Sequence, residues 1–141
     1  MAESILRPIL NAFVADAILS SAVPSGLWLD EEPEEKSLPF VVVSALEELP
    51  EWASAPGPYI EKSSVRFAVY QVGALACDTI CGKLKDCFDR AAMAFETPGN
   101  TLMKMERTRY QLTRQELRDA NNNLVFEGLV EYDVWVSRTK N

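Results

Sequence analysis

Histidine is absent from this chain of 141 residues, and cysteine occurs only three times, at Cys77, Cys81 and Cys87. Histidine is the side chain that most often performs acid and base catalysis near neutral pH. An odd number of cysteines without a CxxC pair fits neither a disulfide framework nor a zinc site. These absences disfavour an enzyme, a metal centre and an oxidising compartment, and they favour a reducing cytosol.

Other common signatures are missing as well. No glycine-rich phosphate loop of either common type occurs, so nucleotide binding has no support. The apolar stretches stop well short of a membrane-spanning helix, and the opening MAESILRPIL has an acidic residue where a signal peptide needs basic ones. We therefore expect a soluble protein that is not exported through a membrane. The string from Ser137 to Lys140 has Ser-x-x-Lys spacing, but it is too short and too near the chain end to indicate catalysis.

The composition is that of an ordinary globular protein. Apolar residues make up 48% and charged residues 25%, so residues 1–141 can form one domain with its own core. The net charge is −7 and the sequence pI about 4.6. Such a surface repels phosphate backbones and anionic membranes, which disfavours nucleic-acid binding and membrane association. We expect no cofactor and no metal.

Two stretches have apolar residues at helical spacing. The first predicts a helix over 4–21, with Ser4 at its start. The second predicts a helix over 77–91 that carries all three cysteines on its apolar stripe. Free cysteine is among the most buried residue types, so these thiols are predicted to pack in the core and not to act as nucleophiles. An enzyme acting through Cys77 or Cys81 is the weakest alternative.

Strand patterns fill most of the remaining chain, separated by proline-bearing loops at 22–39 and 47–59. The acidic run in the first loop lacks the ligand spacing of a calcium loop and is predicted to be solvated. The order α-β-β-α-β-β predicts an α+β fold, a two-layer sandwich with a mostly antiparallel four-stranded sheet, helices on one face and a long C-terminal hairpin. The predicted strands are 40–46, 62–72, 102–117, with a bulge near Glu106, and 124–136.

The last predicted strand is about twice the usual length and carries apolar residues on both of its faces. At about 3.3 Å per residue, the thirteen residues of 124–136 span roughly 43 Å, so the strand should project beyond its sheet or bend. One face holds six apolar residues in phase, with Gly128 as a candidate kink. The second face interleaves Val125, Leu129 and Trp135 with acidic residues. A monomer would expose those apolar side chains.

Two further groups of residues have alternative interpretations. Trp28 and Trp52 lie in loops, where each either anchors an interface or folds back over its own domain. Arg107, Arg109 and Arg114 on the hairpin either form a basic patch for an acidic neighbour or are simply solvated. The sequence leaves both choices open.

Three segments, taken in order and spacing, resemble a known family. The segments LPFVVVSALEE, SVRFAVYQVGALACDTICGKLKDCFD and EGLVEYDVWVSR are similar to those of the tail terminator, or tail completion, proteins of long-tailed bacteriophages. Typical members have an N-terminal helix, a loop leading to a Leu-Pro-aromatic strand, an aromatic-rich strand, an A-x-x-I-x-x-x-L helix and a final strand ending in Tyr-x-Val-Trp. The resemblance covers most of the chain, and 96–122 fits it least.

The resemblance implies a structural virion protein without catalysis, assembled in the host cytoplasm into a ring, commonly a hexamer, on the end of the tail tube. The ring would stop tube growth and form the surface for head–tail joining. Its partners would be further copies of itself, the tail tube protein, and a head–tail stopper or neck protein, while DNA passes through the lumen without specific binding. On this hypothesis Val125, Leu129 and Trp135 make subunit contacts, and Trp52, Arg107 and Arg109 face neighbouring rings.

Two alternatives remain. A neck or head-completion (connector) protein on the portal side would need the same ring and equally little catalysis. A small cytosolic ligand-binding regulatory domain could use the same fold class, and it would require a pocket with convergent polar groups.

Overall fold

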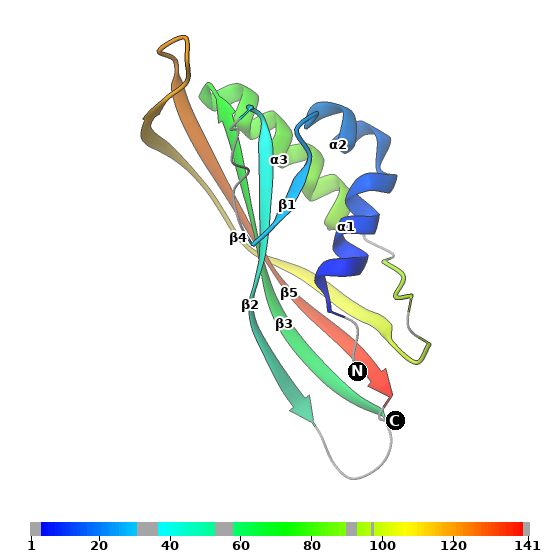
Figure 1. Cartoon of the computed structure of the whole chain (residues 1–141). Coiled ribbons are helices and arrows are strands. Elements are labelled where there is room, and N and C mark those ends of the chain that lie inside the picture. Colours follow the sequence, from blue (N-terminus) through cyan, green and yellow to red (C-terminus); the bar gives the residue numbers. More distant parts are fainter. Residues whose placement is uncertain (1–3, 31–36, 53–57, 90–92, 97, 140–141) are drawn as a thin grey trace.

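Five strands form one long twisted sheet, and helices cover one of its two faces (Figure 1). The structure is a computed structural model that describes residues 4–30, 37–52, 58–89, 93–96 and 98–139. For 46–52, 58, 117 and 139 it describes the backbone alone. The α+β class, the mostly antiparallel pairing and the C-terminal hairpin are as predicted.

The sheet has five strands, so the prediction of four is wrong. The missed strand is β1, which has three residues and runs parallel to the start of its neighbour; the other pairs are antiparallel. A strand of three residues is too short to show period-two alternation, and this one lies between a glycine turn and the acidic run. The spatial order is β1-β2-β3-β5-β4. The strands are β1 (Leu27–Leu29), β2 (Phe40–Trp52), β3 (Pro58–Val72), β4 (Thr101–Arg118) and β5 (Leu124–Thr139).

The strand predicted over 40–46 corresponds to β2, which is longer. Residues 47–52, predicted as part of a loop, continue the strand. Glu48 pairs with Ser63 and Pro50 with Glu61, with bulges on either side of this stretch. Proline is tolerated in an edge strand, since its missing N–H then costs no ladder hydrogen bond. β2 is an edge strand where β1 no longer pairs with it, so Pro50 does not end the strand as the sequence pattern predicted.

The N-terminal helix is divided in two, contrary to the single helix predicted over 4–21. Helix α1 (Leu6–Ala15) ends at Asp16, whose backbone is extended, and α2 (Ala17–Ala22) begins immediately after it. Asp16 Oδ1 accepts a hydrogen bond from the amide of Leu19 at 2.9 Å, as an N-cap residue does. The break changes the direction of the chain, so the apolar stripe predicted for one continuous helix does not face the core throughout. Val14 and Ile18, two residues of that stripe, are 66% and 70% exposed.

Helix α3 (Ala74–Phe88) lies along β3 and β5 and forms the centre of the core. From Cys77 to Phe88 its buried stripe is the predicted one: Cys77 and Cys81 are fully buried, and Cys87 is half-buried. Residues 90 and 91, the last two of the helix predicted over 77–91, lie outside the described residues. The rings of Phe67 and Phe88 lie with their centroids 4.7 Å apart between sheet and helix.

The terminal strand does not project beyond its sheet. β5 lies between β3 and β4 and pairs with β3 from Val125 to Thr139. The sheet as a whole is long and twisted, and the paired ends of β2, β3 and β5 run past the helices (Figure 1). Four residues of β5 that face the helices are fully buried, as the alternation predicts: Val130, Tyr132, Val134 and Val136.

Gly128, the candidate kink, lies where α3 packs closely against β5, and the pairing of β5 with both neighbouring strands continues through it without a register shift. A Cβ at this position would lie 2.2 Å from Cys81 Sγ and 3.5 Å from Cys77 Sγ. Real Cβ atoms do not approach a sulfur atom so closely, so only glycine allows the helix and the sheet to pack at this distance. Cys77 Sγ also lies 3.6 Å from the carbonyl oxygen of Phe126.

Gly128→Ala should therefore destabilise the fold by about 1–3 kcal/mol, the usual cost of overpacking a core. The measurement is the free energy of unfolding by urea. Cys81→Ala removes the clashing sulfur, so Gly128→Ala combined with Cys81→Ala should be less destabilised than the sum of the single variants. Strict additivity would show that the sulfur atom is not what excludes a side chain here.

Candidate assembly surface

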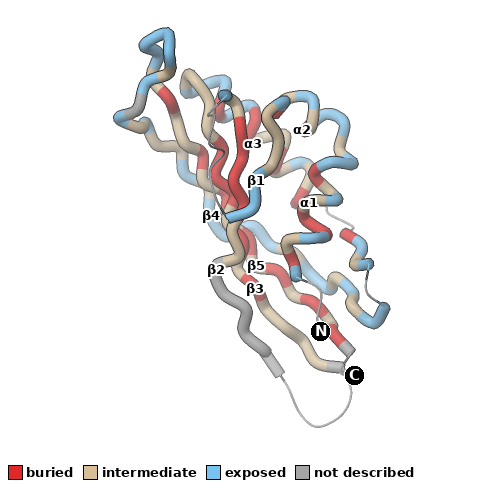
Figure 2. The backbone as a smooth tube through the Cα atoms, viewed as in Figure 1, coloured by how far each residue is buried: buried red, intermediate tan, exposed pale blue. Residues whose placement is uncertain are grey.

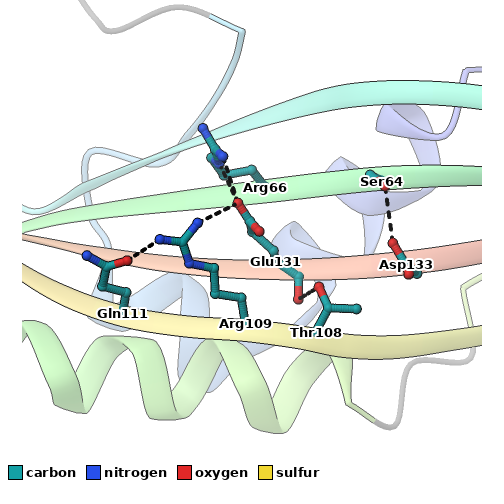
Figure 3. Close-up of polar contacts among 7 residues, drawn as sticks. All are labelled: Ser64, Arg66, Thr108, Arg109, Gln111, Glu131 and Asp133. Carbon is teal, nitrogen blue, oxygen red and sulfur yellow. Dashed lines mark hydrogen bonds and ion pairs between the residues drawn. The ribbon is translucent and has the colours of Figure 1, made fainter.

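The face of the sheet opposite the helices carries a network of ion pairs across three strands (Figure 3). We call this side the open face. It consists of the residues of β5 that alternate with the buried ones, together with their partners on β2, β3 and β4. The tube coloured by burial shows little full burial on β4 and alternating burial along β5 (Figure 2).

Glu131 is the centre of this network. Its Oε1 lies 2.7 Å from Arg66 Nη2 on β3 and 3.9 Å from Arg109 Nη1 on β4. Arg66 Nε also donates to the same oxygen at 2.8 Å. One carboxylate therefore ties three neighbouring strands together on a face that no helix covers (Figure 3).

Further polar pairs extend the network in both directions along β5. Asp133 accepts a hydrogen bond from Ser64 Oγ at 3.1 Å and lies 3.6 Å from Lys62 Nζ. Toward the other end, Tyr70 donates to Glu127. Opposite charges directly across strands stabilise a sheet by roughly 0.2–1 kcal/mol per pair. The open face is thus made largely of matched charges.

The three residues predicted for subunit contacts lie on this face but differ in exposure. Val125 is 6% exposed, so its own chain already covers it. Leu129 is half-buried in a hollow of about 290 Å³, with Val42 and Ala68 beside it. Trp135 is also half-buried, with Lys104 Nζ 4.8 Å and Lys62 Nζ 5.4 Å from its ring centroid. Their role in an interface remains a prediction.

Arg107 and Arg109, two of the three residues predicted to face a neighbouring ring, lie on opposite faces of the sheet. Arg107 pairs with Tyr132 in the register and so lies on the helix side, where its Nη1 is 3.2 Å from Asp89 Oδ2. Arg109 lies on the open face beside Glu131. The side chain of Trp52 lies outside the described residues.

Trp28 and Arg114, for which the sequence allows two interpretations each, lie on the outer strands of the sheet. Trp28 is 40% exposed on β1, and its Nε1 donates to the carbonyl oxygen of Ser25 at 2.9 Å. Arg114 is exposed on β4 and makes no ion pair with a described residue.

A buried ion pair lies on the helix side near the end of the sheet, and the sequence patterns did not indicate it. Arg138 is 1% exposed, and its Nε donates to Glu61 Oε1 at 2.9 Å. The ring of Phe95 lies 5.6 Å from the guanidinium carbon. Within the described part of the chain, Arg138 Nη1 has no hydrogen-bond partner. The sequence contains one indication of this burial: Arg138 follows the same two-residue alternation as the four buried residues of β5 from Val130 to Val136.

Tyr132 and two of the three thiols, Cys77 and Cys87, are held in their neutral forms, whereas hydrogen bonding to Cys77 lowers the pKa of Cys81. Burial, together with the hydrogen bond that Tyr132 donates to Asp89 at 2.6 Å, raises the pKa of Tyr132. Hydrogen bonding to Cys81 and burial raise the pKa of the Cys77 thiol. Burial likewise raises the pKa of Cys87 to about 12. Cys77 and Cys87 therefore lack the thiolate that a nucleophile requires.

The described residues bring no group of three potential metal ligands together. Of their helices, none combines the length and hydropathy that crossing a bilayer demands. A hollow of about 750 Å³ lies beside the start of β4. Its apolar lining includes Met93, Phe95, Met103 and Met105, and its polar lining consists of Asp89, Asn100, Thr101 and Lys104. Of the polar groups beside this hollow, Asp89 binds Tyr132 and Arg107, while Asn100 Nδ2 has no hydrogen-bond partner among the described residues.

Comparison with known proteins shows a shared fold. The sequence matches no protein-family model and no curated protein sequence. Among solved structures, the chain is similar to one from the "Virion of native gene transfer agent (GTA) particle", with a TM-score of 0.70 and 16% sequence identity. The match covers 95% of this chain and 95% of that chain. A chain of that virion therefore shares this fold over 95% of its length.

The buried and the exposed ion pairs should differ in their effect on stability. Glu61→Ala leaves the charge of Arg138 buried without a partner, which typically costs about 3 kcal/mol. Glu131→Ala removes a carboxylate whose arginine partners are 40% and 49% exposed, so the expected loss is about 1 kcal/mol or less. Urea unfolding of both variants measures the difference. Equal losses would contradict the assignment of Arg138 as a buried, paired charge.

The three thiols should react slowly with a thiol reagent at pH 8 and quickly once the chain is unfolded in urea. Cys77 and Cys81 are fully buried, and the pKa of Cys87 is raised. Time courses of Cys87→Ser and of the unaltered chain separate the half-buried thiol from the two buried ones. A thiol in the folded protein that reacts faster than a free cysteine would instead indicate an enzymatic nucleophile.

Proposed function

We propose that this protein is a tail terminator: a structural virion protein that forms a ring on the end of a phage-type tail tube, stops tube growth and provides the head–tail joining surface. The observation that carries the proposal is the likeness to a gene transfer agent virion chain across 95% of both chains. The family pattern in the sequence supports it independently. The protein acts by assembly and performs no catalysis.

The shape of the sheet suits such a part. Leu129 and Trp135 are only half-buried on a face that the chain's own helices leave uncovered. Patches of this kind, surrounded by polar groups, mark protein interaction sites. We propose that the open face around these residues contributes to the contact between neighbouring subunits. The number of six subunits in the ring is what the resemblance to tail terminator proteins implies.

The charge suits a ring around DNA. A net charge of −7 per subunit keeps phosphates from adhering to the lumen, so DNA passes without specific binding. The partners of the ring would be the tail tube protein on one side and a head–tail stopper or neck protein on the other. The protein would be located in the virion, at the junction of tail and head.

Deletion of the gene in its phage or phage-like element should give tubes of uncontrolled length that do not join heads. Electron microscopy of the particles measures tube length and joining. Complementation with Trp135→Glu should fail although the variant folds, because a glutamate beside Lys62 and Lys104 is tolerated in the monomer. The matched control is Leu75→Glu, which changes an 80% exposed residue of α3 and should restore normal particles.

Normal particles after deletion would end the proposal. Tubes of correct length that still fail to join heads would instead indicate the neck or head-completion protein. Binding of the purified protein to isolated tail tubes, compared with tailless heads, separates these two roles directly. Restoration by Trp135→Glu would leave the terminator role intact and remove Trp135 from the contact.

A further inference from the structure

One edge of the sheet and its open face carry opposite charge at the same level, and the side chains of both are among the described residues. Strand β4 forms this edge, and its stretch 101–114 contains four basic residues and one acidic residue. On β5, the residues from 127 to 135 that point to the open face include three acidic ones and no basic one. They are Glu127, Leu129, Glu131, Asp133 and Trp135. The register pairs 127–135 with 104–113 of β4, so the two surfaces are level with each other.

Each surface contains one charged side chain that makes no ion pair with a described residue. On the open face, Glu131 and Asp133 each lie beside a lysine or arginine of their own chain, whereas Glu127 has only the hydrogen bond from Tyr70. On the edge, the unpaired residue is Arg114, and the other three basic residues have acidic partners. In the register, Arg114 lies one residue from the level of Glu127. The two side chains point to opposite faces of the sheet, so they cannot pair within one chain.

An exposed apolar side chain of the edge is also level with one on the open face. Met103 is 54% exposed at the bulge of β4 between Leu102 and Lys104. These two flanking residues are opposite Val136 and Trp135 of β5. Met103 therefore lies at the level of Trp135, which is half-buried. Contact between copies at this level would remove apolar surface of both side chains from water.

We propose that the β4 edge of one copy lies on the open face of the next copy, where Arg114 pairs with Glu127 and Met103 packs on Trp135. A rotation axis along the strands preserves the level of every residue, so both pairs form in the same contact. The bulges of β4 prevent continuous backbone pairing, and its side chains make the contact. The inference rests on the proposed function for the closed ring, and it adds which surface of a neighbouring subunit covers the open face.

An edge laid on a face turns each copy relative to the one before it. The edge of a sheet points along the plane of the sheet, whereas the open face points away from that plane. Contact between the two therefore rotates the next copy about the strand direction, and repeated rotation in one sense closes a ring when it divides the circle. Two edges that met would instead extend the sheet in its own plane. The angle at which edge and face meet sets the number of copies.

Charge exchange at the proposed pair tests the contact in the strain that lacks the gene. Arg114→Glu and Glu127→Arg should each lower the yield of joined particles about tenfold or more, since like charges then meet at every contact of the ring. The double variant, with both changes in one chain, should recover most of the yield. Both single variants produced in one cell should recover it as well, because each reversed edge can then meet a reversed face. Electron microscopy counts the joined particles.

Three variants separate the contact from general effects of charge and folding. Arg7→Glu, the matched control, makes the same charge change on an exposed residue of α1 and should leave the yield unchanged. Glu127→Gln keeps an acceptor for Tyr70 and removes only the charge, so the chain should fold normally and still give a lower yield. Met103→Glu should also fold and lower the yield, whereas Leu75→Glu, at an 80% exposed residue, should not. Circular dichroism of the purified variants checks the fold.

The outcomes distinguish this contact from the terminator role itself. Full yield from Arg114→Glu or from Glu127→Arg would overturn the contact between edge and face and leave the terminator role intact. No recovery by the double variant, in a chain that circular dichroism shows to be folded, would overturn it as well. Normal particles after deletion of the gene would instead end the terminator role.

Discussion

The alternation of β5 in the middle of the sheet is the constraint on which the rest of the structure depends. Its even-numbered positions from 128 to 138 are buried beneath the helices, while the odd ones from 127 to 137 face the open side. A slip of one residue would place acidic side chains in the core and valines in solvent. Pairing on both sides fixes this register over almost the whole strand, so the two faces of the sheet are chemically distinct from end to end.

The packing on each face of the sheet follows from this alternation of β5. On the covered side, Gly128 lets α3 approach until Cys81 fills the space of a missing side chain, and aromatic rings close the core beside it. On the open side, Glu131 and Asp133 hold β3 and β4 by their charges. Matched charges keep an uncovered sheet face soluble, and they still leave Leu129 and Trp135 available to a partner.

Long patterns in the sequence predicted most of this architecture. The cysteine stripe of α3 and the alternation of β5 extend over enough residues for their period to dominate local exceptions. Short or interrupted elements were missed for the opposite reason. β1 has three residues, Asp16 divides a helix by capping its second half, and Pro50 lies at an edge where proline does little harm.

The candidate site was only partly predictable, because its partners come together across strands. The sequence shows Glu131 and Asp133 as interruptions of an apolar pattern, while Arg66 and Lys62 lie more than sixty positions earlier. Only the register joins them. The same holds for Arg107 and Arg109, which are two positions apart yet lie on opposite faces because a bulge separates them. Charge spacing along one strand therefore did not define a patch.

A sheet with two free edges must avoid indefinite growth. Continuous pairing of backbone edges would join sheets into fibres, and β4 prevents this with bulges and charged side chains. With its backbone edge blocked in this way, β4 can make further contacts only through side chains, and the sheet keeps its half-buried apolar residues Leu129 and Trp135 on the open face.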